Sequence, residues 1–258
     1  YFKKGLPTIV NTSFIANGML DLYEITNENK YLDVAKSSCE FIINDLNRYN
    51  EEDSFCFSYT PLNNGACIHN ANMLGAALLA RVNHYINNDE YLENAKKSMK
   101  YSINHQNEDG SWFYGVGWKQ KWIDSFHTGY NLLALNDYIN FTNDRRYIEN
   151  LKNGYEFYLN YFFTKEGFVK YYHNKIYPLD SHAFAHAIVT LYTLSNLSER
   201  SNPILEKVIR KGIRIFWNEH LGYFYYKKDK YILNKIDYIR WVQIWMFYAL
   251  IILVANYE

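Results

Sequence analysis

The sequence predicts an all-α fold, an α/α toroid of helical hairpins with short β-hairpins on one rim. Two observations predict it: one sequence phrase recurs along the chain, and apolar helices alternate with amphipathic ones. The composition supports a packed core, because 48% of the residues are hydrophobic and only 21% are charged. We expect one toroid domain over residues 1–258, lacking the N-terminal hairpins of a closed ring.

The recurring phrase is an apolar helix, a Tyr, a Thr-Asn or Asn-Asn turn, and then a Tyr that opens a second helix. Its copies begin at Asp21, Asn83, Asn136 and, in degenerate form, Thr193. The second tyrosines, Tyr31, Tyr91 and Tyr147, lie 60 and 56 residues apart. Self-similarity at this period indicates stacked units that cannot bury their apolar faces alone.

Each unit is expected to contain an inner helix that is apolar nearly all round and an outer helix that is amphipathic. Inner helices are predicted to begin near Thr8, Ile68, Phe126, Ser181 and Tyr238. Outer helices are predicted to begin near Asn29, Asp89, Arg145 and Pro203. These starts make about four and a half hairpins, whereas a closed toroid uses six or seven. The chain is therefore expected either to form an open arc or to lack N-terminal hairpins, and we favour the second interpretation.

Segments rich in Gly and aromatic residues connect the units. FCFSYTP, GSWFYGVGW, GFVKYYHNKIYP and GYFYYKKDKYI alternate aromatic and polar residues. Such alternation is typical of half-buried strands, so these segments predict the short β-hairpins.

The charge balance excludes several partners. Lys+Arg and Asp+Glu both number 27, which leaves no net field to gather phosphates, and no basic stripe or phosphate-binding glycine loop is present. We therefore expect no nucleic-acid partner and no cofactor. The apolar run at residues 241–257 contains Gln243 and is shorter than a bilayer requires, so it predicts a buried helix and no membrane span.

The three cysteines, Cys39, Cys56 and Cys67, lack metal-site spacing. Their odd number argues against a disulfide framework and gives a weak preference for a reducing, cytoplasmic compartment. The sequence leaves the oligomeric state open.

Three aspartates precede predicted inner helices in register with the repeat. Asp124, Asp180 and Asp237 lie 56 and 57 residues apart. Equivalent positions in a toroid face the same mouth, and the positive ends of the helix dipoles there favour anionic groups. Helix capping alone is the alternative explanation for each aspartate.

Ionisable residues accompany these aspartates, and this pattern favours proton-transfer chemistry. We predict Asp124, His127, Asp180 and His182 as catalytic residues, with the histidines as general acid or base and the aspartates as orienting or acidic partners. Metal binding by the same groups is an alternative, but no tight ligand spacing appears, and no metal is expected. The predicted substrate-binding residues are His69, Asn70, Trp118, Trp122, Asp237, Arg240 and Trp241.

The aromatic residues favour a carbohydrate substrate. They make up 19% of the chain, and rings near a mouth can stack on the apolar faces of pyranoses. Arg240 could bind a uronate carboxylate, or simply pair with Asp237.

The repeat layout, together with DSFHTGYNLLAL, LDSHAFAHAI and RWVQIWMFYAL, resembles the six-hairpin glycosidase-like superfamily. More closely, these segments look like toroid proteins associated with prokaryotic surface-polysaccharide genes. The resemblance implies an active site at the toroid mouth and an activity among glycoside hydrolases, polysaccharide lyases and sugar epimerases. We expect cleavage of a glycosidic bond, by hydrolysis or β-elimination.

Three alternatives remain at this point: a sugar epimerase, a glycan-binding toroid without catalysis, and a protein like the terpenoid cyclases. The last rests on residues 106–112, QNEDGSW, which match the QxxxGxW repeat of those cyclases, in which Gln and Trp tie helix ends together. A single copy is present without a DxDD acid motif, so we interpret these residues as a structural tie.

Overall fold

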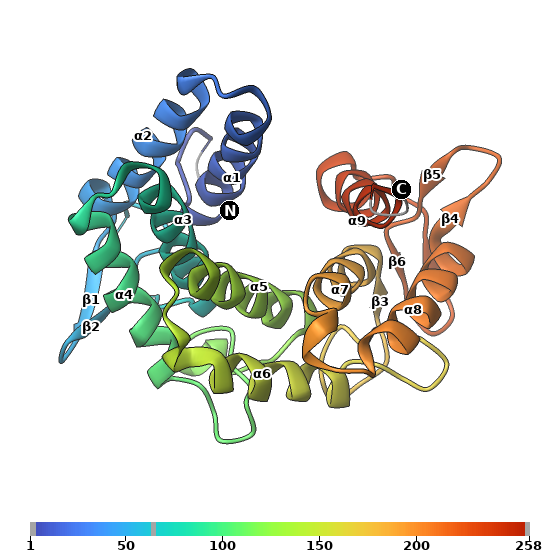
Figure 1. The fold of residues 1–258 in the computed structure, drawn as a ribbon. Coiled ribbons are helices and arrows are strands. Elements are labelled where there is room, and N and C mark those ends of the chain that lie inside the picture. Colours follow the sequence, from blue (N-terminus) through green and yellow to red (C-terminus); the bar gives the residue numbers. More distant parts are fainter. Residues whose placement is uncertain (1–3, 63–65, 256–258) are drawn as a thin grey trace. The chain divides into compact units, whose positions relative to one another are not determined.

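The computed structural model describes residues 4–62 and 66–255. Nine α-helices and several short antiparallel strand pairs lie within these ranges (Figure 1). By compactness the chain divides into two units. The first comprises Tyr1–Glu108, Trp112–Lys121 and Ala134–Leu151, and the second comprises Asp109–Ser111, Trp122–Leu133 and Lys152–Glu258. Each unit is described by itself.

The first unit is built from two complete helical hairpins. Helix α1 (Ile9–Thr26) packs on α2 (Asn29–Asp45) and on α3 (His69–Ile86), and α3 packs on α4 (Asp89–Asn104) (Figure 1). The hairpin of β1 (Arg48–Glu51) and β2 (Ser54–Phe57) contacts α4. Helix α3 is buried over most of its length, whereas α4 buries one face, so inner and outer helices differ as the sequence predicts.

The repeated turn has the same backbone conformation in three copies. Asn27, Asn87 and Asn143 all adopt the left-handed conformation, with φ of 56°, 51° and 55°. Asn tolerates this region better than most other residues that carry a Cβ atom, which explains why these three hairpins reverse at an Asn.

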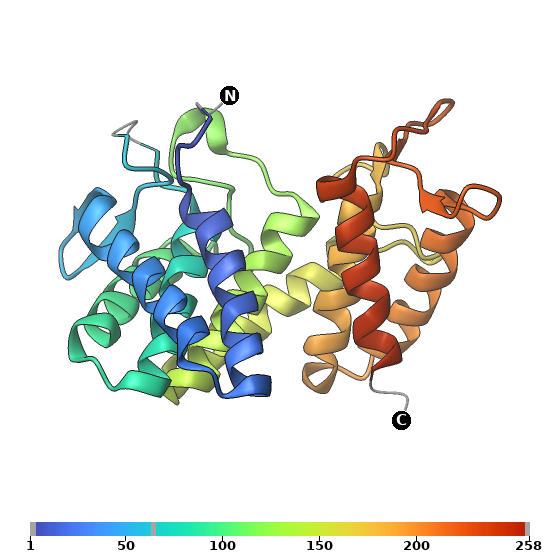
Figure 2. The same ribbon diagram turned by 90° about the horizontal axis from the view of Figure 1, so that it is seen from above.

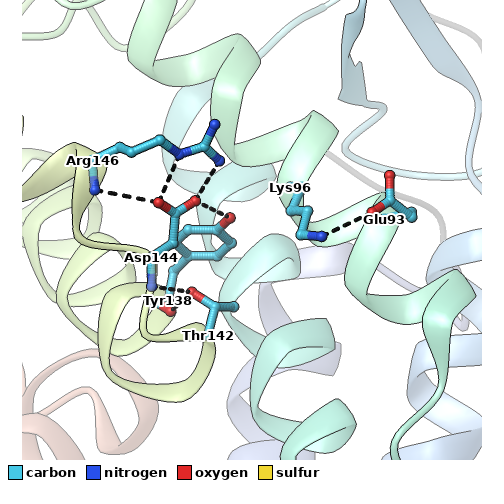
Figure 3. A network of polar contacts seen from close by, with 6 residues as sticks. All are labelled: Glu93, Lys96, Tyr138, Thr142, Asp144 and Arg146. Atoms are coloured by element: carbon cyan, nitrogen blue, oxygen red, sulfur yellow. Dashed lines mark hydrogen bonds and ion pairs between the residues drawn. The ribbon is translucent and has the colours of Figure 1, made fainter.

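Polar contacts hold the third copy of this turn together (Figure 3). Asp144 accepts hydrogen bonds from Arg146 Nε at 2.8 Å and from Arg146 Nη2 at 2.6 Å, and from the Tyr138 hydroxyl at 3.3 Å. The backbone N–H of Asp144 donates to Thr142 Oγ1 at 3.2 Å. On neighbouring α4, Lys96 and Glu93 form an exposed ion pair at 2.9 Å, which the same figure shows. The turn is therefore fixed by side chains that the repeat itself supplies.

The QNEDGSW segment is a structural tie, as the sequence interpretation holds. Gln106 Nε2 donates to the Asn150 carbonyl at 2.9 Å, and Asn150 Nδ2 donates to Gln106 Oε1 at 2.7 Å. Trp112 is buried and donates from Nε1 to the Ser102 carbonyl at 2.8 Å. Gly110 has φ of 89°, and a Cβ atom there would lie 2.3 Å from the Asn153 carbonyl oxygen, so only glycine fits.

Helices α5 (Ser125–Thr142) and α6 (Ile148–Tyr161) are continuous, and each contributes residues to both units. The first turn of α6 is preceded by a 3₁₀ turn, Arg145–Tyr147. The N-terminal half of α5, which follows Asp124, belongs to the second unit together with most of α6.

In the second unit, α7 (Ser181–Thr193) packs on α8 (Ser201–Phe216) and on α9 (Ile244–Val254) (Figure 2). A 3₁₀ turn, Ser195–Leu197, joins α7 to α8, and a π-helical turn, Ile239–Gln243, leads into α9. Five short strands complete the unit: β3 (Leu179–Asp180), β4 (Trp217–Asn218), β5 (Tyr223–Phe224), β6 (Lys227–Lys228) and β7 (Leu233–Asn234).

These strands lie at the N-terminal ends of α7 and α9 and at the C-terminal end of α8. Strand β3 runs directly into α7 and pairs with β6, which pairs with β7, while β4 pairs with β5. Gln243 joins β5 to the π-helical turn, because its side chain accepts from the Phe224 N–H at 2.9 Å and donates to the Phe224 carbonyl at 2.7 Å. The strands therefore fix where α7 and α9 begin.

No described helix is both long and apolar enough to cross a membrane.

Candidate functional site

Asp124 and Asp180 stand at the starts of two helices of the second unit and are each only 2% exposed. Asp124 Oδ1 accepts from the backbone N–H of His127 at 2.9 Å. Asp180 Oδ1 accepts from the backbone N–H groups of His182 at 2.9 Å and Ala183 at 3.4 Å. Both carboxylates therefore cap a helix, yet capping occupies one oxygen of each.

The second oxygen of Asp124 organises a carboxylate–histidine pair. Asp124 Oδ2 lies 2.7 Å from His127 Nδ1 and also accepts from Trp122 Nε1 at 3.0 Å. The carboxylate keeps the proton on Nδ1, so Nε2 carries the lone pair of the neutral ring, and it stabilises the imidazolium once Nε2 takes up a proton. The His127 side chain is 22% exposed while that of Asp124 is 1% exposed, so a partly exposed imidazole is held by a buried carboxylate.

Asp180 has the properties of a proton donor. Burial raises the pKa of its carboxyl to about 6, against hydrogen bonds from Ala183, His182 and Trp241 and the positive charge of Lys227, which lower it. A carboxylic acid with a pKa near 6 is substantially protonated in mildly acidic solution and can release its proton to a substrate.

His182 lies within a cage of aromatic rings. Its ring stacks on Trp245 at 4.8 Å between centroids, and Trp241 and Phe126 lie at 4.2 and 5.1 Å. Its Nε2 lies 2.9 Å from the Tyr130 hydroxyl. Burial, aided by the nearby His127, lowers the pKa of His182 to about 3, so the imidazole is neutral.

One nitrogen of this caged histidine lacks a hydrogen-bond partner among the described residues. His182 is 1% exposed, and its Nδ1 makes no hydrogen bond to any residue that the structure describes. Buried polar atoms are rarely left without a partner, so a ligand hydroxyl or a water is the expected occupant beside this atom.

The groups described so far meet around Phe126. Its ring lies 4.1 Å from that of His127 and 5.8 Å from that of Trp241, which in turn donates a hydrogen bond to Asp180. The second unit therefore brings six of the predicted site residues together: Asp124, His127, Asp180, His182, Trp122 and Trp241.

Tyr130 and Tyr171 also belong to this cluster, although neither is among the predicted catalytic or substrate-binding residues. Tyr130 pairs with His182 and follows His127 by one helical turn on α5, so the i, i+3 spacing was the available signal. Tyr171 accepts a hydrogen bond from the Ser125 N–H at 2.9 Å through its carbonyl, and its ring lies 5.4 Å from Phe126. No local sequence pattern connects Tyr171 to α5.

Asp237 does not repeat the capping geometry of Asp124 and Asp180. Both Asp237 and Arg240 are exposed. The π-helical turn that follows has Tyr238 at its N-cap position and no capping hydrogen bond from a side chain. Asp237 therefore follows the spacing of the repeat in the sequence. Its local structure differs from that of Asp124 and Asp180 because α9 is preceded by a π-helical turn.

The remaining predicted binding residues belong to the first unit. His69 is buried, its Nδ1 lies 3.3 Å from Ser102 Oγ, and burial with the charges of His105 and Lys121 lowers its pKa to about 3. Asn70 is also buried, and its Oδ1 has no partner among the described residues. Trp118 is 81% exposed.

The described residues contain no group of three or more His, Cys, Asp or Glu side chains placed to hold a metal ion. A surface hollow of about 450 Å³ lies in the first unit, and none of the predicted site residues lines it. Its lining comes from α1 and α2: Thr12, Asp33, Val34, Ser37, Ser38 and Phe41.

Solved structures with a similar fold come from α/α-toroid proteins of the six-hairpin glycosidase-like superfamily. A cellobiose 2-epimerase from Bacillus thermoamylovorans has a TM-score of 0.70 at 14% identity, over 86% of this chain and 64% of that one. An unsaturated glucuronyl hydrolase specific for heparin has a TM-score of 0.72 at 14% identity, over 94% and 73%. The predicted α/α toroid is confirmed by these matches.

A family 76 α-mannanase from Bacteroides thetaiotaomicron has a TM-score of 0.69 at 11% identity, over 86% of this chain and 65% of that one. The chain thus spans about two thirds of the length of these structural relatives. A search of curated proteins found no match. The model of glycosyl hydrolase family 76 matches residues 10–228, which include Asp124, His127, Asp180 and His182. Because this match covers most of its length, the chain belongs to glycosyl hydrolase family 76.

Proposed function

We propose that the protein cleaves glycosidic bonds of an oligosaccharide or polysaccharide by hydrolysis, with Asp180 as the general acid and His127 as the general base. The observation that carries the proposal is the pairing, in one unit, of a buried carboxyl of raised pKa with a partly exposed histidine anchored by Asp124. Membership of a carbohydrate-active family supports the substrate class.

The proposed reaction divides proton transfer between the two residues. Asp180 gives its proton to the glycosidic oxygen as the bond from that oxygen to the anomeric carbon breaks. His127 Nε2 takes a proton from the water whose oxygen bonds to the same carbon. The resulting imidazolium is stabilised by Asp124, and proton exchange with solvent restores both residues.

The same geometry argues against a covalent intermediate on Asp124. A retaining mechanism needs a carboxylate oxygen that can reach the anomeric carbon. Asp124 uses both oxygens for three hydrogen bonds, from His127 N–H, His127 Nδ1–H and Trp122 Nε1–H, and its side chain is 1% exposed. We therefore propose direct attack by water, with inversion at the anomeric carbon.

Sugar binding is assigned to the aromatic cage. Trp241 is 38% exposed and can present its ring to the C–H face of a pyranose. The Nδ1 atom of His182 and the hydroxyl of Tyr130 supply polar groups for sugar hydroxyls beside that face. A neutral His182 suits this role, because it can bind a hydroxyl without a net charge.

Epimerisation is the second candidate. The supporting observation is that the imidazole rings of His127 and His182 belong to the same cluster, and proton removal and return at a carbon next to a carbonyl requires a pair of such groups. Among the similar solved structures are a cellobiose 2-epimerase and a sugar epimerase from a ruminal bacterium. Epimerisation produces no new reducing end, whereas hydrolysis does.

The test is turnover of a panel of α- and β-linked manno-, gluco- and galacto-oligosaccharides, scored for new reducing ends and for epimers. We expect His127→Gln and Asp180→Asn each to lower kcat by about 10²–10⁴-fold with KM little changed. The control is His220→Gln, because His220 is exposed and lies outside the cluster. Glycan binding without turnover by the unaltered protein, or full activity of both site variants, would refute the proposal.

A further inference from the structure

Two of the three cysteines meet in the core of the first unit. Cys56 lies in β2, and Cys67 lies two residues before α3. Their thiols are hydrogen-bonded to each other, and with Tyr101 they form one buried cluster. Cys39 is also buried, but it lies in α2.

The two thiols of this pair have different environments. Cys67 packs against Cys56 and Tyr101, whose thiol and hydroxyl groups act as donors toward it, and it precedes the 18-residue helix α3 by two residues. The Cys56 bond and the Tyr101 bond lower the pKa of Cys67 to about 7, although burial and Glu51 oppose them. Burial raises the pKa of Cys56, which acts as the donor.

The two cysteines also differ in their exposure to solvent, and Cys67 is the more exposed. All three cysteines are buried, but Cys67 keeps 9% of its surface exposed, whereas Cys56 and Cys39 are 0% exposed. The Cys56 Sγ also lies 3.4 Å from the Phe57 carbonyl oxygen, a second acceptor for its proton. Reactive cysteines are typically thiolates with partial exposure, and a resolving thiol must lie in contact with them.

We propose that Cys67 and Cys56 form an oxidation site, at which a hydroperoxide oxidises Cys67 and Cys56 then closes a disulfide with it. The inference concerns the first unit and does not depend on the proposed glycosidase activity.

The chemistry needs a hydroperoxide as oxidant and balances with it. The Cys67 thiolate attacks one peroxide oxygen, the O–O bond breaks, and the products are a sulfenic acid on Cys67 and hydroxide, which takes up a proton from solvent. Cys56 sulfur then bonds to Cys67 sulfur, the S–OH bond breaks, and the hydroxyl leaves as water with the Cys56 proton. Overall, two thiols lose two hydrogens and hydrogen peroxide becomes two molecules of water.

The disulfide would join β2 to the start of α3. The Cys67 carbonyl accepts from the Val116 N–H at 3.0 Å, and the His69 N–H donates to the Tyr114 carbonyl at 3.1 Å. A covalent bond at Cys67 would therefore restrain the first turn of α3. It would also restrain residues 114–116, which are hydrogen-bonded to Cys67 and His69.

The first test measures thiol reactivity in the folded chain with iodoacetamide, followed by peptide mass spectrometry. We expect Cys67 to be alkylated first, at a rate that reaches half its maximum near pH 7, while Cys39 and Cys56 react only after unfolding. Tyr101→Phe keeps the ring but removes one donor, so it should move that midpoint to higher pH. Alkylation of Cys67 no faster than that of Cys39 would overturn the proposal.

The second test treats the reduced chain with hydrogen peroxide. We expect a linked Cys56–Cys67 peptide that has lost two hydrogens and regains them with a thiol reductant. Cys56→Ser should instead accumulate a sulfenic acid on Cys67 that dimedone captures, and Cys67→Ser should show neither product. Cys39→Ser is the matched control and should behave like the unaltered chain.

Circular dichroism of each variant identifies any that fails to fold, and the unaltered chain alone still decides the outcome. A linked peptide supports the proposal. A sulfenic or sulfinic acid on Cys67 in the unaltered chain without the Cys56 link, or oxidation confined to methionines, contradicts it.

Discussion

At the scale of single residues, the site combines groups whose chemistry is set by burial. Asp180 and His182 are two residues apart in sequence. Burial raises the pKa of Asp180 to about 6 and lowers the pKa of His182 to about 3. Desolvation disfavours the charged form of each, so both are held neutral over the same mildly acidic range. A neutral acid beside a neutral imidazole is what proton donation and hydroxyl binding require.

The raised pKa of Asp180 leads us to expect a specific dependence of folding stability on pH. Its pKa is about 6 in the folded chain against 3.8 for the ordinary carboxyl, so the folded state holds a proton that the unfolded state releases between these values. The free energy of unfolding should fall as pH rises through that window. Asp180→Asn cannot titrate, so between pH 4 and 7 its stability should improve relative to the unaltered chain by about 3 kcal/mol.

Urea unfolding at a series of pH values measures this difference. His182 has the opposite linkage, since its lowered pKa costs stability as pH falls from 6.5 toward 3, but it is present in both proteins and cancels. Parallel stability curves for the two proteins would show that Asp180 does not hold a proton near pH 6.

At the scale of elements, the sequence predicts the helix starts closely because the signals are local. Predicted inner helices near Thr8, Ile68 and Ser181 begin at Ile9, His69 and Ser181, and outer helices begin at Asn29 and Asp89 as expected. N-cap residues and left-handed asparagines act within one turn, so a sequence reveals them directly.

Two features were beyond such reasoning because they depend on distant residues. The pairing of Tyr130 with His182 joins residues 52 apart, and nothing near either residue specifies it. The π-helical turn before α9 coincides with the bonds from Gln243 to Phe224, 19 residues earlier. Local patterns thus predict the capping aspartates and Trp241, but not the pairing of Tyr130 with His182.

The approach of α5 to α7 gives a prediction at this scale. A Cβ atom on Gly129 would lie 2.5 Å from His186 Nδ1 and 2.8 Å from Thr190 Oγ1, which are themselves paired at 3.2 Å. We expect Gly129→Ala to lower the free energy of unfolding by about 1–3 kcal/mol, because overpacking outweighs the gain in helix propensity.

Gly18→Ala is the matched control for Gly129→Ala. Gly18 also lies within a helix, α1, and a Cβ atom there meets nothing within 4 Å. Its substitution should raise stability by up to about 1 kcal/mol in the same denaturant titration. Equal effects of the two substitutions would mean that α7 can move away from α5 at little cost.

At the scale of the whole molecule, the repeat and the balanced charge are the informative properties. The repeat predicted the fold, which the similar solved structures confirm, and the zero balance of 27 basic and 27 acidic residues agrees with a neutral substrate. The division of the described chain into two units was not predicted, because α5 and α6 each look like one uninterrupted helix in sequence.

The charge balance predicts weak salt dependence. Without a net field to steer a charged ligand, KM for the preferred oligosaccharide should change by less than about twofold between roughly 0.05 and 0.5 M NaCl. Steady-state kinetics across this range measure it. A steep rise in KM with salt would instead indicate a substrate that carries carboxylates, such as a uronic acid, bound by a local cationic group.

The tryptophans of the second unit have a practical consequence. Trp122 donates to Asp124, and Trp241 and Trp245 enclose His182, so three of the six indoles in the chain touch the groups assigned to catalysis and sugar binding. Occupation of the cage would change the surroundings of half the tryptophans at once. Their emission can therefore report ligand entry directly, without a label and before any reaction is known.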